Sequence, residues 1–113
     1  MSFTEGTLII TAGDTVWIEV EVRDRDGTLL DLSTIPTIKF ALKLFGRVNI
    51  DPSVTKDKGD MTILSLGNIR VILDPADTID LYGKFDLELE LTDSVGDVST
   101  VVVREMIIER TII

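Results

Sequence analysis

The feature that most constrains the fold is an alternation of apolar and polar residues with a period of two. The stretch "TVWIEVEVR" places one set of branched apolar residues on the same parity: Val16, Ile18, Val20 and Val22. Residues 38–43, 69–73 and 85–92 alternate in the same way. Successive side chains of a strand point to opposite faces, so each stretch predicts a strand with one buried and one solvent-facing side. Strands of this kind are typical of antiparallel sheets packed face to face.

Turn residues separate these strands at short, regular intervals. "DRDG" at 24–27, "KGD" at 58–60, "LGN" at 66–68 and "DSVGD" at 93–97 each place glycine beside small polar residues. Residues 74–81, "DPADTIDL", instead predict an N-cap, a proline at the first helical position and one or two helical turns. We therefore expect a single all-β domain over residues 1–113, with about seven strands in two sheets and one short helical crossover.

Two segments do not follow the regular pattern. Residues 46–60 are the least regular stretch and are expected to form a mobile loop. In the last strand Val101 and Val103 share one parity, whereas Met106 and Ile108 have the other. A β-bulge at residues 104–105 would turn all four inward, and we favour it over a strand that is apolar on both faces.

Composition excludes many functions. With 11 basic and 20 acidic residues the net charge is −9, which disfavours binding to nucleic acid or to an anionic membrane. The absence of cysteine and histidine removes thiolate nucleophiles, Ser-His triads and the usual zinc sites. No signal peptide or membrane-spanning run is visible. We expect no enzyme activity, no cofactor and no metal, although a hydrolase using carboxylates alone is a third option.

Paired carboxylates on strands are the first candidates for chemistry. Glu19 with Glu21, and Glu88 with Glu90, share a strand face at a spacing of about 7 Å, which glycosidase carboxylates also use. Such enzymes need aromatic sugar platforms, and the sequence has only four Phe, one Tyr and one Trp. We interpret the pairs as a solvated face. In an immunoglobulin-like strand order, Lys39 and Lys43 would lie near the carboxylates of residues 86–90.

The aspartates of "DRDG" resemble part of a calcium-binding loop. The third acidic position and the glutamate at position twelve of an EF-hand are missing, so a hairpin turn is the favoured interpretation. Weak calcium binding stays open. Trp17 lies on the polar parity of its strand. It is either an exposed binding residue or is covered by the N-terminal segment or the 46–60 loop.

The order of these features resembles a known family. "GDTVWIEVEVRDRDGTLLDLS", "IKFALK" and "NIRVILDPADTIDLYGKFDLELELTDSVGDVSTVVVREMIIE" are similar to small immunoglobulin-like β-sandwich domains of phage and prophage tails and baseplates, of the BppU N-terminal type. The resemblance covers about residues 12–109. It departs from the family pattern in the longer 46–60 region and in the final strand. It implies a structural or docking role and no catalytic residues.

We therefore expect a virion structural protein, associated with a tail, baseplate or fibre, that acts by protein–protein docking. Its partners would be other virion proteins or itself as a homo-oligomer, with neither nucleic acid nor membrane. Its location would be the virion or the host cytoplasm during assembly. The candidate interface residues are Trp17, Ile72, Val102 and Ile107. The alternative is a carbohydrate- or calcium-binding adhesion module of a bacterial surface protein.

Overall fold

The computed structural model describes residues 7–24, 26–46 and 52–110, except for the side chains of residues 101–103. It contains eight strands: β1 (Leu8–Thr11), β2 (Val16–Glu21), β3 (Thr37–Leu44), β4 (Val54–Asp57), β5 (Met61–Ser65), β6 (Asn68–Leu73), β7 (Gly83–Thr92) and β8 (Val98–Glu109). One helix, α1 (Pro75–Thr78), and two 3-10 turns, Leu32–Thr34 and Lys58–Asp60, connect them. Among the described residues, no helix is both long and apolar enough to cross a membrane.

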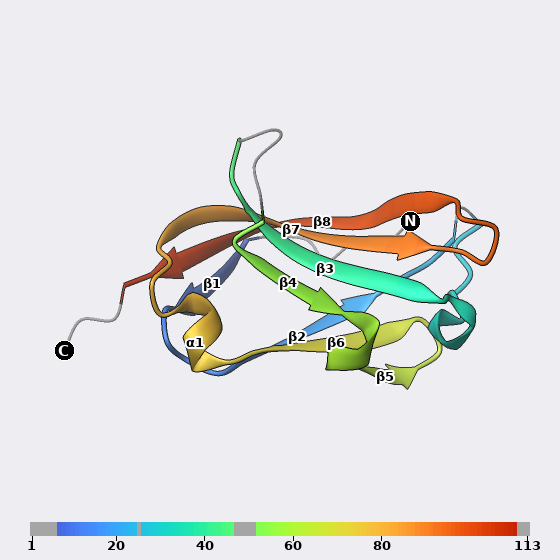
Figure 1. Ribbon diagram of the computed structural model, residues 1–113, viewed down its shortest axis with the longest axis horizontal. Coiled ribbons are helices and arrows are strands. Elements are labelled where there is room, and N and C mark those ends of the chain that lie inside the picture. The colour runs from blue at the N-terminus through green and yellow to red at the C-terminus, as the bar shows by residue number, and fades with distance from the viewer. Residues whose placement is uncertain (1–6, 25, 47–51, 111–113) are drawn as a thin grey trace.

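The strands form two sheets that lie one above the other (Figure 1). The larger sheet has the order β1-β8-β7-β3-β4, and the smaller has the order β2-β6-β5. This is the immunoglobulin-like arrangement, in which the second, sixth and fifth strands oppose a sheet built on the eighth, seventh and third. β1 pairs in parallel with β8 and not with β2. The predicted β-sandwich class is confirmed.

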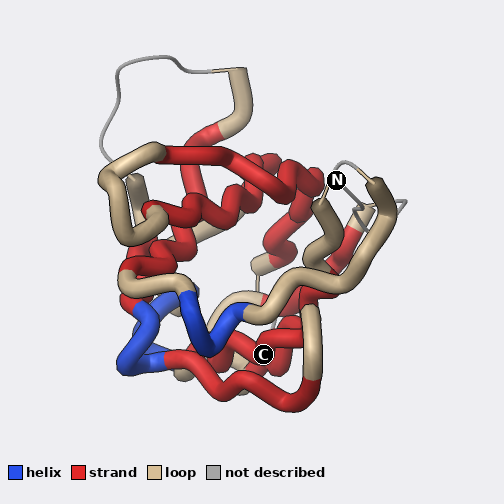
Figure 2. The backbone as a smooth tube through the Cα atoms, turned by 90° about the vertical axis from the view of Figure 1, so that its right-hand side faces the viewer, coloured by secondary structure: helices blue, strands red, loops and turns tan. Residues whose placement is uncertain are grey.

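The predicted apolar parities face one another across the core. Figure 2 shows the strands of both sheets surrounding the interior that these side chains fill. The fully buried positions come from both layers and from the 3-10 turn before β3, and the largest of them are Phe40, Leu32, Ile38, Leu42, Ile69, Leu73, Leu87, Leu89, Met106 and Ile108. Each such side chain is worth roughly 1.5–3 kcal/mol when it leaves water. Because every second side chain of a strand is buried in this core, the side chains between them lie on the outer faces of the two sheets.

Two predictions about irregular segments were wrong. The expected 46–60 loop contains β4 and the following 3-10 turn, because Val54 is buried and β4 pairs with β3. Residues 47–51 lie outside the described part. The bulge in β8 is not at residues 104–105: the register slips between Leu89 and Glu90, whose partners are Val102 and Thr100. The extra residue is therefore Val101, and Val103 pairs with Glu88.

The crossover between the two sheets is anchored at its helical turn. The Asp74 N–H donates to Oδ2 of Asp77 at 2.7 Å, which closes the first turn of α1 as its N-cap sequence predicted. The Lys56 ammonium of β4 lies 2.8 Å from the same Asp77 carboxylate oxygen. The buried Thr78 hydroxyl accepts the Gly13 N–H at 3.0 Å. These contacts connect α1 to an edge strand and to the β1–β2 turn.

Asp77 also makes stability depend on pH. Partial burial acts to raise its pKa, but the Lys56 hydrogen bond, the Asp74 N–H and the Lys56 charge together hold the pKa below its usual value of 3.8. A carboxyl with a lowered folded-state pKa stabilises the fold above its unfolded pKa, and this stabilisation is lost as pH falls through the folded pKa. The loss of stability at acid pH should therefore include a contribution from the pair of Asp77 and Lys56.

We predict that Asp77→Asn, which keeps an oxygen acceptor but removes the charge, lowers the free energy of unfolding by about 1–2 kcal/mol at pH 7. The deficit should shrink as pH falls through the folded-state pKa of Asp77, because the wild-type carboxyl then loses its own charge. Urea unfolding followed by circular dichroism at several pH values measures it, with the exposed Asp80→Asn as control. A deficit that stays constant from pH 7 to pH 2 would contradict the role of the charge.

The backbone of the β5–β6 turn packs closely against the backbone of the segment that follows β2. The Val22 N–H donates to the Gly67 carbonyl at 2.7 Å. Gly67 has a φ of +74°. A Cβ at this position would lie 2.7 Å from Leu29 Cδ2 and 2.9 Å from the Val22 carbonyl oxygen. Gly27, with φ +83°, has nothing within 4 Å of a built Cβ. Both positions need positive φ, but only one is crowded.

We predict that Gly27→Ala lowers unfolding free energy by about 1–2 kcal/mol through backbone strain alone. Gly67→Ala should add a further overpacking cost of about 1–3 kcal/mol. Chemical denaturation of both variants separates the two effects, because the backbone conformations match. Equal losses for the two substitutions would mean that the turn does not pack under the 22–30 loop as described.

Candidate functional site

The outer face of the smaller sheet exposes a tryptophan side chain near the start of β2. Trp17 is 62% exposed and is the direct cross-strand neighbour of the half-buried Ile72. The described residues therefore leave Trp17 exposed, while residues 1–6 and 47–51, which belong to the two segments considered as its cover, lie outside the described part. The described part of the 46–60 region does not shield it.

Trp17 is held in a small cluster with two charged residues. The Arg70 guanidinium carbon lies 4.5 Å from the centroid of the indole ring. Nη2 of Arg70 donates to Oε1 of Glu19 at 3.1 Å, and Glu19 is two residues from Trp17 on the same strand face. The Arg70 Nε is buried and makes no hydrogen bond among the described residues. The ring thus lies against a guanidinium, and Trp17 as a whole is still 62% exposed.

This cluster has the residue types that dominate protein interfaces. Tryptophan and arginine are enriched among the few residues that supply most of the binding energy of an interface. A cation stacked on an aromatic ring contributes about 0.5–1 kcal/mol at an exposed site. Strand β2 limits the conformations of Trp17, so little additional ordering is needed on binding. We define Trp17, Arg70, Glu19 and Ile72 as the Trp17 cluster.

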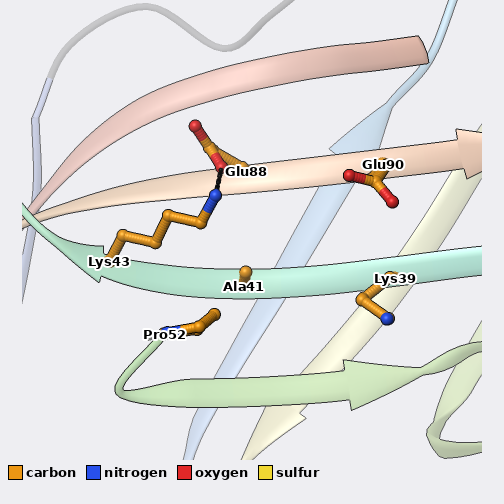
Figure 3. A pocket seen from close by; sticks show the side chains of 6 residues that line it. All are labelled: Lys39, Ala41, Lys43, Pro52, Glu88 and Glu90. Carbon is orange, nitrogen blue, oxygen red and sulfur yellow. Dashed lines mark ion pairs between the residues drawn. The ribbon is translucent and has the colours of Figure 1, made fainter. Parts of the chain in front are cut away.

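The outer face of the larger sheet contains a shallow depression of about 230 Å³. Ala41 forms its floor because this small residue sits between longer side chains, and Figure 3 shows Lys43 reaching across to Glu88 beside it. The lining also includes Lys39, Glu90 and Pro52. The depression combines cations and anions in equal number, so it has no strong charge preference.

The ion pair in this depression confirms a prediction from strand order. Lys39 pairs in register with Glu90, and Lys43 with Asp86. The Lys43 ammonium lies 2.8 Å from Oε2 of Glu88. That hydrogen bond raises the pKa of Lys43, against partial burial which lowers it, with the Glu88 and Glu90 charges adding to the rise. Glu88 therefore acts as a charge partner on a sheet face.

A row of side chains, most of them apolar, crosses the same outer face beyond one end of the depression. Ile9 of β1 is 59% exposed and neighbours the half-buried Ile107 of β8. Ile107 neighbours Lys84 of β7, whose ammonium lies 4.2 Å from the Phe45 ring centroid and 3.1 Å from Oε2 of Glu105. The row is thus Ile9, Ile107, Lys84 and Phe45.

The four predicted interface residues do not form one site. Trp17 and Ile72 lie together on the smaller sheet, whereas Ile107 lies on the larger. The backbone of Val102 pairs with Leu89, and its side chain lies outside the described part. The sequence analysis missed Ile9 and Phe45. The signal for Ile9 was the uncharged run "TLIITA" at residues 7–12, which predicts a strand by its β-branched content.

The aspartates of the turns are occupied by backbone hydrogen bonds. Oδ1 of Asp24 accepts the N–H groups of Asp26 and Thr28, and Oδ1 of Asp93 accepts those of Val95 and Asp97. Within the described ranges, no group of three or more acidic side chains could hold a metal ion. The favoured interpretation of "DRDG" as a hairpin turn is supported by this geometry, since the Gly27 N–H also donates to the Asp24 carbonyl at 3.1 Å.

Comparison with known proteins gives little beyond the fold. The sequence matches no protein-family model and no curated protein. Among solved structures, the chain is similar to the Siglec domain of GspB, with a TM-score of 0.47 and 10% sequence identity over 95% of this chain. The chain spans 55% of the length of that structure. A similarity at this level carries no inference about function.

Proposed function

We propose that this β-sandwich is a non-enzymatic docking module that contributes to an assembly through its outer faces. The observation that carries the proposal is Trp17, which is 62% exposed near the start of β2 and is stacked by Arg70. Together with the half-buried Ile72 beside it, this ring forms apolar surface that a bound molecule would remove from water. The chemical inventory supports the same proposal, because the sequence has no histidine or cysteine.

We further propose that the assembly is a phage or prophage particle. This part of the proposal rests on the resemblance of residues 12–109 to tail and baseplate domains. The protein would then be located in the virion, or in the host cytoplasm during assembly. The candidate partners are the proteins encoded in the neighbouring reading frames. Neighbours without any tail or baseplate component would remove the support for this part of the proposal while leaving the docking role to be tested by itself.

The docking role predicts a specific loss of affinity. Trp17→Ala should weaken binding to the partner by at least about thirtyfold, because hot-spot truncations cost about 2 kcal/mol or more. Calorimetric titration against each purified neighbouring protein measures the effect. The matched control is Tyr82→Ala, since Tyr82 is 59% exposed and is stacked by Arg110 at 3.9 Å but lies outside the Trp17 cluster.

Equal losses in the two variants, or no loss in either, would contradict a docking site at Trp17. The same titrations distinguish the adhesion alternative, in which an exposed indole ring stacks on a sugar. Saturable binding of a simple saccharide that Trp17→Ala abolishes would favour that alternative. A large rise in Tm at millimolar Ca²⁺ would favour a calcium-dependent adhesion module, whereas the docking role requires no change in Tm.

A further inference from the structure

The edges of the two sheets differ in how well they are protected against pairing with another strand. Edge strands expose unpaired backbone groups, and proteins block them with charges, inward-pointing ionic groups or bulges. β2 carries Glu19 and Glu21. β4 carries Lys56, whose ammonium turns to Asp77 at the margin of the core. β5 has a register irregularity between Ile63 and Ser65. β1 has none of these three features.

The exposed edge of β1 is prepared to accept a strand. The Ala12 N–H donates to the Glu109 carbonyl at 2.7 Å, so alternate residues of β1 direct their backbone groups to β8. The N–H groups of Ile9 and Thr11 accordingly point to the other side, where no described strand lies. The Ile9 side chain, on the outer face, is itself 59% exposed. The Thr11 carbonyl on this side accepts the Asp14 N–H at 3.2 Å, so the edge offers the backbone groups of Ile9 and the N–H of Thr11 beside an apolar side chain.

The sequence of β1 is complementary to itself, which points to β1 of a second copy as the strand that pairs with this edge. Residues 7–11 read "TLIIT", which is nearly the same in both directions. In an antiparallel pairing centred on Ile9, Thr7 would oppose Thr11 of the second copy, Leu8 would oppose Ile10, and Ile9 would oppose itself. Cross-strand pairs of β-branched residues and of threonines are favourable. A two-fold symmetric contact requires a surface that complements itself in this manner.

Charge points to the same edge. Each chain has a net charge of −9, so two copies repel one another wherever acidic groups would meet. No charged residue occurs from Gly6 to Gly13, although 27% of the sequence is charged. Pairing through β2 would instead bring Glu19 and Glu21 against their own copies. Contact through β1 keeps like charges apart, and the remaining long-range repulsion is reduced by salt.

We propose that β1 pairs antiparallel with β1 of a second copy, which joins the two five-stranded sheets into one continuous sheet across a two-fold axis. Ile9 and Ile107 of both copies then form one apolar strip on its outer face. The Trp17 cluster lies on the other sheet of each copy and stays free. The dimer therefore carries two copies of the proposed docking site, and the inference goes beyond that function without depending on it.

The test is the mass of the intact chain in solution, measured by sedimentation velocity over a range of concentrations. The wild type should reach the dimer mass, with a lower dissociation constant at about 1 M salt than at about 0.01 M, because the Debye length falls from about 30 Å to about 3 Å. Ile9→Lys should be monomeric under the same conditions. Val95→Lys is the control, since Val95 is 80% exposed in the turn between β7 and β8, at the far end of β8 from residues 106–109 that pair with β1.

A wild type that stays monomeric into the millimolar range would overturn the proposal, as would an Ile9→Lys variant that dimerises like the wild type. Hydrogen exchange on the wild type keeps the test decisive if Ile9→Lys does not fold. The amides of Ile9 and Thr11 should become more protected as concentration rises, and unchanged protection in a dimeric sample would place the contact elsewhere. Trp17→Ala should leave the dimer intact, so this proposal and the docking role fail independently.

Discussion

The contact between the inner faces of the two sheets determines the rest of the molecule. Phe40 and Leu42 of β3 and Leu87 and Leu89 of β7 are almost fully buried against the smaller sheet. Because side chains of a strand alternate with a period of two, fixing these residues inside also fixes which residues lie outside. Trp17 is exposed for this reason: its neighbour Ile18 belongs to the core, and its neighbour Val16 packs against the core. The surface chemistry is thus a consequence of core register.

The long alternating strands were predictable, and the short ones were not. β2, β3, β6 and β7 each have enough alternation to specify which face is buried. β4 has four residues and a single buried apolar side chain, Val54, so its place in the sheet depends on pairing with β3 and not on its own pattern. The bulge in β8 was misplaced because parity alone shows that a slip is needed but not where the ladder breaks.

The candidate surfaces were predictable to a smaller extent. The place of Trp17 on the polar face of its strand followed from parity. On the other sheet, the proximity of Lys39 and Lys43 to the carboxylates of β7 followed from strand order. The stacking of Arg70 on Trp17 could not be predicted from the sequence, because it depends on the register between β2 and β6. That register places Trp17 opposite Ile72 and Glu19 opposite Arg70. The edge position of β1 also depends on topology, since among the described strands β1 pairs with β8 alone.

The central claim is that Trp17 is an available binding group in the isolated chain. It is the single tryptophan, so the emission maximum of intrinsic fluorescence and its collisional quenching by acrylamide report on this residue alone. The account predicts an emission maximum close to that of indole in water and quenching nearly as efficient as that of a free tryptophan derivative. A blue-shifted emission that acrylamide reaches poorly in the folded chain would contradict it.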